Sequence, residues 1–163
     1  MRKNQLPDEE FEKRMERSHW AARRVETFLK SKGMDVELLP MKIRPTFEER
    51  FQYSDKADMI WHRKGGDCRI EVKHRPDLRF TCAADYKFPT LFVDTVASFE
   101  RERELPLGFY TIVNADATVF AYVPPKTQSK WKKIKTFDSA TKQKTWFYEI
   151  PVAEVPKWVK MSQ

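Results

Sequence analysis

Two carboxylates and one lysine, placed on either side of a glycine pair, could hold a divalent cation beside a fixed positive charge. Asp58 precedes Glu71 and Lys73, and Gly65-Gly66 lies between them. A two-residue turn at these glycines would fold the stretch into a β-hairpin in which Asp58 opposes Lys73. Because side chains alternate along strands, we expect Asp58, Glu71 and Lys73 on one face, within reach of one another.

The same register assigns the second face of the predicted hairpin. With Asp58 opposite Lys73, Ile60 lies opposite Glu71, and the alternate residues point the other way. Apart from Arg63 near the turn, that second face is apolar and consists of Met59, Trp61, Cys68, Ile70 and Val72. An apolar face that packs on a core would hold the polar face in a defined position, as a small metal site on a sheet requires.

Hydrolysis of a phosphodiester is the chemistry that this constellation predicts. Two carboxylates can hold one or two Mg²⁺ ions with waters completing an octahedron, and Mn²⁺ is expected to substitute. Asp58 and Glu71 are the predicted ligands, and the Val72 carbonyl is the predicted third. The metal would acidify a water molecule, while Lys73 would position or deprotonate that water or offset charge in the transition state.

Two other interpretations of the sequence remain open. A Glu-x-Lys sequence on a strand is common in basic proteins, so the same fold could bind nucleic acid or protein without hydrolysis. A protein-binding regulator also fits the chain length, but no sequence feature favours it. Replacing Lys73 or Asp58 by alanine separates these classes, because only the nuclease would lose an activity.

The elements that must position these residues follow from the hydrophobic pattern. An amphipathic helix is predicted over residues 7–32, with Gly33 as its stop. A strand over residues 34–43, a loop over 46–56 and the hairpin follow, and Pro76 ends the hairpin. A short helix over 95–104, capped by Asp94, comes after the apolar run 90–93. Further strands are expected at 109–113, 118–123 and 146–150. This order predicts an α/β fold with a mixed central sheet flanked by helices.

Asp58 followed by Glu71-Val72-Lys73, after one helix and one strand, resembles the PD-(D/E)XK nuclease superfamily. The resemblance covers residues 9–123. Within the superfamily, the chain is similar to small Holliday-junction resolvases and restriction-type enzymes. It implies a restriction-endonuclease-like core of the order αβββαβ, in which the Asp and Glu bind Mg²⁺ and the Lys assists the water. Residues 124–163 would form a basic, β-rich elaboration of a single domain over residues 1–163.

Two positions depart from the pattern of that superfamily. Ala57 precedes Asp58 where the family name has a proline, which many members also lack. Many members carry a further carboxylate on the first helix, at a place that corresponds here to Ala22. Glu26 lies one turn along and could act from the same side, and Glu16 and His19 are weaker candidates on that flank.

A net charge of +7 and a pI near 9.4 favour an anionic partner, most simply DNA. Four basic residues near the predicted site are the first candidates for contacts with a scissile phosphate: Lys64, Arg69, His74 and Arg75. The segment 126–144 adds a second group in which lysines alternate with aromatic residues. The lysines predicted to track a phosphate backbone there are Lys130, Lys132, Lys133 and Lys135. Lysines that keep an exposed strand soluble are the alternative.

Few features bear on the cellular setting. The chain has two cysteines outside any CxxC pair and no apolar run near the roughly 20 residues that cross a bilayer. These features predict a cytoplasmic protein, in a prokaryotic or viral-host cell, with no membrane association. Cutting both strands of DNA would favour a homodimer. The sequence does not separate DNA from RNA, or an endonuclease from an exonuclease.

Overall fold

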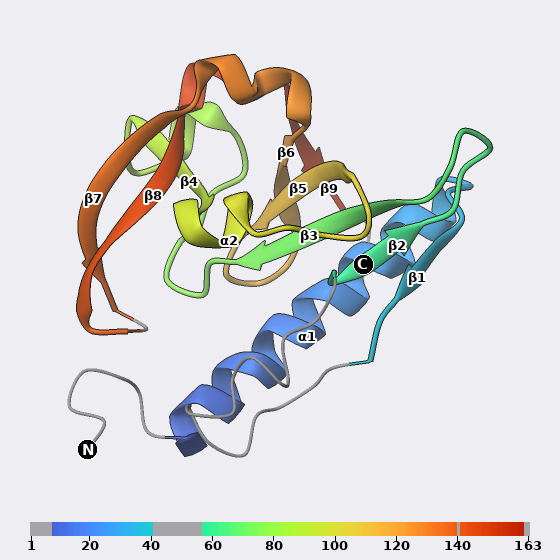
Figure 1. Cartoon of the computed structure of the whole chain (residues 1–163), viewed down its shortest axis with the longest axis horizontal. Coiled ribbons are helices and arrows are strands. Elements are labelled where there is room, and N and C mark those ends of the chain that lie inside the picture. Colours follow the sequence, from blue (N-terminus) through green and yellow to red (C-terminus); the bar gives the residue numbers. More distant parts are fainter. Residues whose placement is uncertain (1–7, 41–56, 140, 162–163) are drawn as a thin grey trace.

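The computed structural model describes residues 8–40, 57–139 and 141–161 of the chain. It has a mixed α/β fold that is mostly β, with one long helix and a mixed sheet (Figure 1). The predicted first helix is confirmed as α1, Asp8–Ser31. The helix ends at Ser31, and Gly33 just beyond it has a φ of +83°, which is accessible to glycine without steric cost. None of the helices in the described ranges is long and apolar enough to cross a membrane.

Six strands form the main sheet, in the order β1-β2-β3-β5-β6-β9. Their bounds are β1 Val36–Leu38, β2 Met59–Trp61, β3 Cys68–His74, β5 Leu107–Val113, β6 Val119–Val123 and β9 Lys157–Lys160. Strands β3 and β5 run parallel, and the other neighbours are antiparallel. The first strand is shorter than predicted, and β9 is a strand that the sequence pattern did not predict. The predicted loop over 46–56 lies outside the described residues.

A second sheet of three strands has the order β4-β8-β7. It consists of β4 Thr90–Thr95, β7 Lys132–Asp138 and β8 Gln143–Pro151. Strand β4 and the short helix α2, Val96–Glu100, connect β3 to its parallel neighbour β5. Three 3₁₀ turns complete the described elements: η2 Ala83–Asp85, η3 Pro125–Lys130 and η4 Val152–Glu154. Helix α2 confirms the position of the helix predicted over 95–104, but α2 is shorter than that prediction.

Hydrophobic residues on the two faces of the main sheet make two separate cores. The first core lies against α1 and joins Ala22 and Val25 to Met59 and Ile70. The second core lies between the main sheet and the second sheet, where Tyr110 and Ile112 of β5 meet Ile150 of β8. Successive side chains of a strand point to opposite faces, so a strand that is covered on both faces supplies residues to both cores. The main sheet is thus the middle layer between α1 and the second sheet.

The β2–β3 hairpin forms as predicted, but its predicted register is wrong. Ile60 pairs with Arg69 rather than with Glu71, and Trp61 pairs with Cys68. The Gly66 amide donates a hydrogen bond of 3.0 Å to the Arg63 carbonyl, so the turn lies one residue earlier than the glycine pair. Moving a turn by one residue shifts the pairing by two. Because the side-chain period of a strand is also two, the predicted polar and apolar faces are retained.

Candidate active site

The carboxylates of Asp58 and Glu71 lie together on the polar face of the β2–β3 hairpin. The Asp58 Oδ2 atom accepts a hydrogen bond of 2.8 Å from the Val72 amide, which fixes its side chain across the two strands. Burial, followed by the nearby charge of Glu71, raises the pKa of Asp58 to about 7, against the opposing effects of Lys73 and the Val72 amide. A hydrogen bond between the two carboxyl groups makes a smaller contribution to the same rise in pKa. Two carboxylates so close together favour a shared proton or a bound cation.

Lys73 lies on the same face and is held by a third carboxylate. Its Nζ atom is 3.2 Å from Asp94 Oδ1, and Asp94 is itself buried. Burial lowers the pKa of the Lys73 ammonium, but the charges of Asp94, Glu71 and Asp58 outweigh that effect and raise the pKa above its ordinary value. Lys73 is therefore a positively charged group at neutral pH in this environment.

Asp94 is a residue of the site that the sequence analysis did not identify. We expected it to cap a helix, but the cap of α2 is Thr95, whose hydroxyl accepts a hydrogen bond of 3.1 Å from the Ser98 amide. The Asp94 carboxylate instead accepts hydrogen bonds from the Tyr110 hydroxyl at 2.7 Å and the Thr95 amide at 2.8 Å. A buried acid directly after the apolar run 90–93 was the available signal, but its partner lies on another sheet.

Two arginines neutralise the other side of Glu71. The buried Arg69 donates from Nε to Glu71 Oε1 at 3.0 Å, and Arg103 lies 3.6 Å from the same oxygen. Arg69 also donates to the Leu105 carbonyl at 2.8 Å. The structure therefore places Arg69 in the interior, where it orients Glu71. Buried charges require such pairing, because unpaired they are strongly unfavourable.

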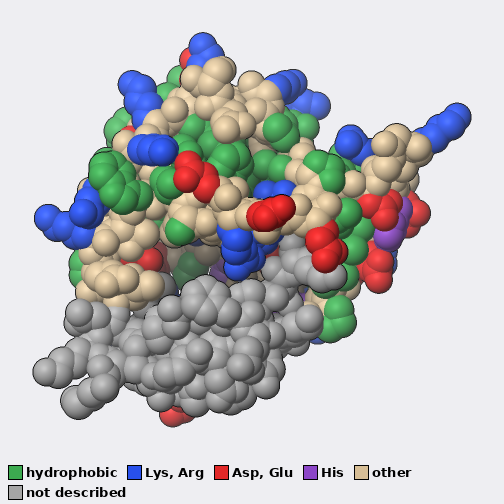
Figure 2. Space-filling view, viewed as in Figure 1, with side chains coloured by type: hydrophobic (Ala, Val, Ile, Leu, Met, Phe, Trp, Pro, Cys, Tyr) green, Lys and Arg blue, Asp and Glu red, His purple; other side chains and the backbone are tan. Residues whose placement is uncertain are grey.

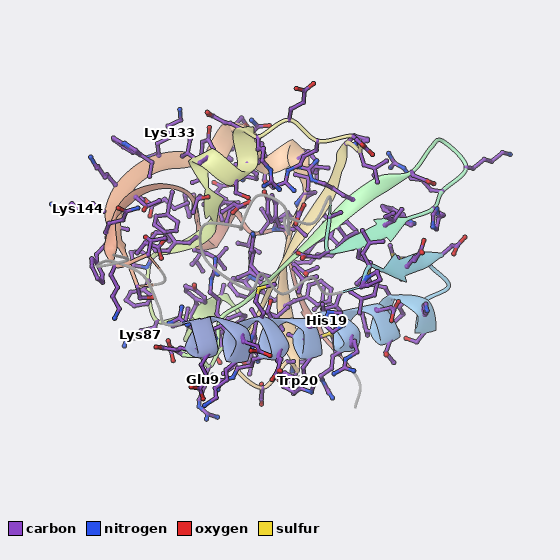
Figure 3. All side chains as sticks on the ribbon, turned by 60° about the horizontal axis from the view of Figure 1, so that its bottom comes forward. Glu9, His19, Trp20, Lys87, Lys133 and Lys144 are labelled. Carbon is purple, nitrogen blue, oxygen red and sulfur yellow. The ribbon has the colours of Figure 1, made fainter. Side chains whose placement is uncertain are left out.

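The sequence predicted Glu26 as the residue of α1 near Asp58, but a different residue of α1 lies there. A cavity of about 30 Å³ reaches Asp58 and is lined by Met15, Ser18, His19, Ala22, Leu38 and Leu39. Figure 3 labels His19 on the side of α1 nearest the strands. That volume accommodates a small number of water molecules. His19, a weaker candidate in the sequence, is thus the titratable side chain of α1 that shares this cavity with Asp58.

Glu26 is committed to a different contact. Its carboxylate accepts a hydrogen bond of 2.8 Å from the Leu38 amide and lies 3.4 Å from Lys30 Nζ. This contact ties β1 to α1, and Glu26 is not among the residues that line the cavity at Asp58. Glu16 is exposed on α1. Ala22, where the resemblance would place a helix carboxylate, thus lines this cavity together with Ser18 and His19.

The other basic residues predicted to contact nucleic acid form a partly buried pair and a group of exposed lysines. Arg75 is partly buried and donates to the Phe92 carbonyl at 3.0 Å. His74 is also partly buried, lies 3.0 Å from the Ala115 carbonyl, and has a pKa that burial lowers. Both residues thus join strands to loops. The exposed members are Lys64 at the hairpin turn, Lys130 in η3, and Lys132, Lys133 and Lys135 on β7.

The donor set fits a hydrated Mg²⁺ ion better than a cation that needs many side-chain ligands. Within the described ranges, no group of three His, Cys, Asp or Glu side chains could hold a metal ion. The carboxylates of Asp58 and Glu71, with the Val72 carbonyl, would supply three oxygens, and waters in the adjacent cavity would supply the others. Mg²⁺ commonly keeps several waters and uses one or two carboxylates.

A scan against protein-family models found no match, and a search of the curated proteins found no similar sequence. The geometry of Asp58, Glu71, Lys73 and Asp94 therefore indicates what chemistry this site can support. That geometry combines a carboxylate pair, a charged ammonium group and a supporting acid that fixes the ammonium. Such a site can bind a divalent cation and an anionic group side by side.

Proposed function

We propose that this protein is a Mg²⁺-dependent nuclease that hydrolyses phosphodiester bonds in DNA. The observation that carries the proposal is the contact between Asp58 and Glu71 on the face that also presents Lys73. Two carboxylates this close together favour a shared proton or a bound cation, and a metal-dependent reaction is the function that uses such a pair beside a charged lysine.

The order of elements supports the same assignment. Helix α1, strands β1 to β3, helix α2 and the parallel strand β5 follow the order αβββαβ of the PD-(D/E)XK core that the sequence resembles. Strand β4 is an addition between β3 and α2. Asp58 directly precedes the second strand of that order and Glu71-Val72-Lys73 lie on the third, which agrees with the places that the resemblance gives to its metal ligands and lysine.

The roles of the protein groups follow from their charges. When Mg²⁺ is bound, it supplies an acidified water and neutralises the phosphate oxygens. Lys73 carries a proton, so we assign it to positioning that water and stabilising the developing negative charge rather than to accepting a proton. Asp94 holds the ammonium group at 3.2 Å, and the Tyr110 hydroxyl holds Asp94. Arg69 orients Glu71 by donating from Nε to its Oε1 atom.

A second candidate function is a nucleic-acid-binding or protein-binding module that does not hydrolyse its ligand. The arginine contacts of Glu71 favour it, because Arg69 and Arg103 already neutralise one oxygen of the predicted metal ligand. The contact between Glu26 and the Leu38 amide favours the binding module as well, because it engages a helix carboxylate that the predicted metal site could have used. Cleavage decides between the two functions.

The first test is a cleavage assay at about 10 mM Mg²⁺ or Mn²⁺, well above the weak affinity typical of sites with two carboxylates. Supercoiled, linear, single-stranded and four-way-junction DNA are compared. We expect Lys73→Gln to lower cleavage by about 10²–10³-fold while DNA binding is retained, since one group that stabilises developing negative charge contributes that much. Glutamine keeps an N–H donor for Asp94, so the variant should still fold.

Two control variants define the result. Lys160→Gln removes the same charge from an exposed position on β9 and should leave cleavage unchanged. Glu26→Gln should also retain cleavage, because the carboxylate of Glu26 anchors β1. Equal cleavage by the Lys73 variant and the parent chain, or no metal-dependent cleavage of any DNA, would reject the nuclease and leave the binding module.

A further inference from the structure

The second sheet extends beyond the core that it covers, and one of its faces changes from buried to exposed along the strands. On β8, Ile150 is fully buried and Tyr148 is partly buried, whereas Trp146 is 50% exposed. These three residues alternate along the strand, so they share one face. The face that packs on the main sheet at one end is therefore open to solvent at the other.

Cations and aromatic rings alternate on this open face. The cross-strand pairs Lys133–Tyr148, Lys135–Trp146 and Phe137–Lys144 all belong to it, because directly opposed residues project from the same side. We call Lys135, Phe137, Lys144 and Trp146 the open patch. Phe137 is 61% exposed, and Lys135 Nζ lies 5.9 Å from the centre of the Trp146 ring. Figure 2 shows Lys and Arg side chains beside apolar ones over the flank formed by β7 and β8.

The same face leads to the candidate active site. Asp94 of β4 is the cross-strand partner of Tyr148, so Asp94 and the open patch project from one side of the second sheet. Asp94 is also the residue that holds Lys73 at 3.2 Å. Between them, α2 covers Tyr148, whose hydroxyl donates to Glu100 at 2.6 Å. A ligand on the open patch therefore lies on the same side of the second sheet as Asp94, which holds Lys73.

We propose that the open patch binds single-stranded nucleic acid, with bases stacked on Trp146 and Phe137 and phosphates neutralised by Lys135 and Lys144. Residues on one face of a strand repeat at about 7 Å, comparable with the length of one nucleotide in an extended single strand. Exposed aromatic rings interleaved with lysines are the arrangement by which proteins hold unpaired bases. In a closed duplex the bases are already stacked and cannot reach these rings.

The proposal deepens the proposed function, on which it rests in one respect: the bound strand is taken to be the substrate. A single-stranded segment at the patch and a scissile phosphate at Lys73 would then lie on the same side of the second sheet. The substrate class is accordingly DNA with an unpaired segment, such as a flap, a single-stranded end or a single strand.

Binding to the full chain is measured by fluorescence anisotropy in EDTA, so that cleavage plays no part. The probes are a labelled oligothymidylate and a blunt duplex of equal length. We expect the single strand to bind more tightly and Trp146→Ala to weaken that binding about tenfold, in the range that base stacking contributes. Trp146→Phe should restore most of the affinity, because phenylalanine also stacks; this variant separates lost stacking from lost folding.

Matched controls come from an exposed lysine on the main sheet and from another exposed ring. Lys135→Gln should weaken binding, whereas Lys160→Gln, at an exposed position on β9, should not. Phe88 is 48% exposed and Lys87 lies 5.5 Å from its ring centre, yet this pair is outside the open patch, so Phe88→Ala should bind normally. Figure 3 labels Lys87 apart from Lys133 and Lys144.

The outcomes separate this proposal from the nuclease. Loss of single-strand binding in the Trp146 and Lys135 variants supports the patch, whether or not the parent chain cleaves DNA. Equal affinity for the duplex, or binding that is insensitive to Trp146→Ala, would overturn it. Tighter binding of a polyglutamate peptide or of anionic phospholipid vesicles, lost in the same variants, would also overturn it and assign the patch to another ligand.

Discussion

At the scale of single residues, the site is a set of mutually dependent charges. Lys73 is held by Asp94, while Glu71 is held by Arg69 and contacts Asp58. Each of these groups would be unfavourable alone in a partly buried position, and each becomes acceptable because a neighbour of suitable charge is fixed nearby. Asp58 is the exception, because burial and the charge of Glu71 outweigh the effect of Lys73 on the pKa of its carboxyl group.

Asp58 should make the metal-free protein less stable as pH rises. Its pKa is raised from 3.8 to about 7 in the folded chain, so the folded state binds more protons than the unfolded state between these values. The stabilisation from this group is then complete below about pH 4 and is lost as pH rises through about 7. We expect Asp58→Asn, which keeps an oxygen acceptor for the Val72 amide, to melt higher than the parent chain at about pH 8.

Thermal melting in EDTA at several pH values measures this difference, and the exposed Asp77→Asn provides the control. Mn²⁺ added at high pH should raise the melting temperature of the parent chain but not that of Asp58→Asn, because ligand binding stabilises only a competent folded state. A difference between the two chains that does not change with pH would contradict the assigned pKa. Stabilisation of both chains by Mn²⁺ would place the metal elsewhere.

At the scale of elements, the pairing of β3 with β5 determines how the site is assembled. Arg69 pairs with Leu107 and Ile70 with Phe109, so Gly108 is an extra residue on β5 and forms a bulge. The bulge allows close approach of the two backbones. A Cβ atom at Gly108 would lie 2.8 Å from Cys68 Sγ and 3.0 Å from the Arg69 carbonyl oxygen. Glycine is required here by proximity, since its φ is not in the left-handed region.

Gly108→Ala should therefore destabilise the fold by about 1–3 kcal/mol, the usual cost of overpacking a core. For a chain of this size that corresponds to a fall in melting temperature of roughly 2–12 °C. Gly65→Ala is the matched control, because a Cβ atom at Gly65 would meet nothing within 4 Å. Equal melting temperatures for the two variants would show that β5 can move away from β3 at little cost.

At the scale of the whole molecule, net charge and its distribution have different consequences. The chain carries 31 Lys and Arg against 24 Asp and Glu, which favours any polyanion. Several of these charges are internal partners, as Arg69 is for Glu71. The lysines on one face of the second sheet, Lys133, Lys135 and Lys144, are exposed and close together. Local arrangement should therefore decide nucleic-acid affinity more than net charge does.

Salt dependence tests this distinction. Replacing Lys135 and Lys144 together by glutamine should reduce the slope of log affinity against log salt by about 1.4, since each neutralised phosphate of a single strand contributes about 0.7. The same replacement of Lys157 and Lys160, which are also exposed, changes net charge equally and should leave the slope nearly unchanged. Equal effects of the two double variants would mean that net charge alone attracts the strand.

Local periodicity made much of the fold and part of the site predictable. The four-and-three spacing of apolar residues predicted α1, and alternation predicted which hairpin residues share a face with Lys73. These predictions depend on the geometry of one element, which neighbouring residues determine. The face assignment was retained despite the wrong register, because an error of two residues keeps every side chain on its side of the strand.

Only the tertiary structure determined the partners of those residues. Asp94 meets Lys73 because the crossover between β3 and β5 passes through the second sheet, and no local pattern encodes that path. Glu26 bonds to the Leu38 amide instead of joining Asp58, because the position of β1 relative to α1 sets its reach. The sequence by itself thus determined the residue types and faces of the site. Long-range packing decided their charge partners, because those contacts join segments that are distant in the chain.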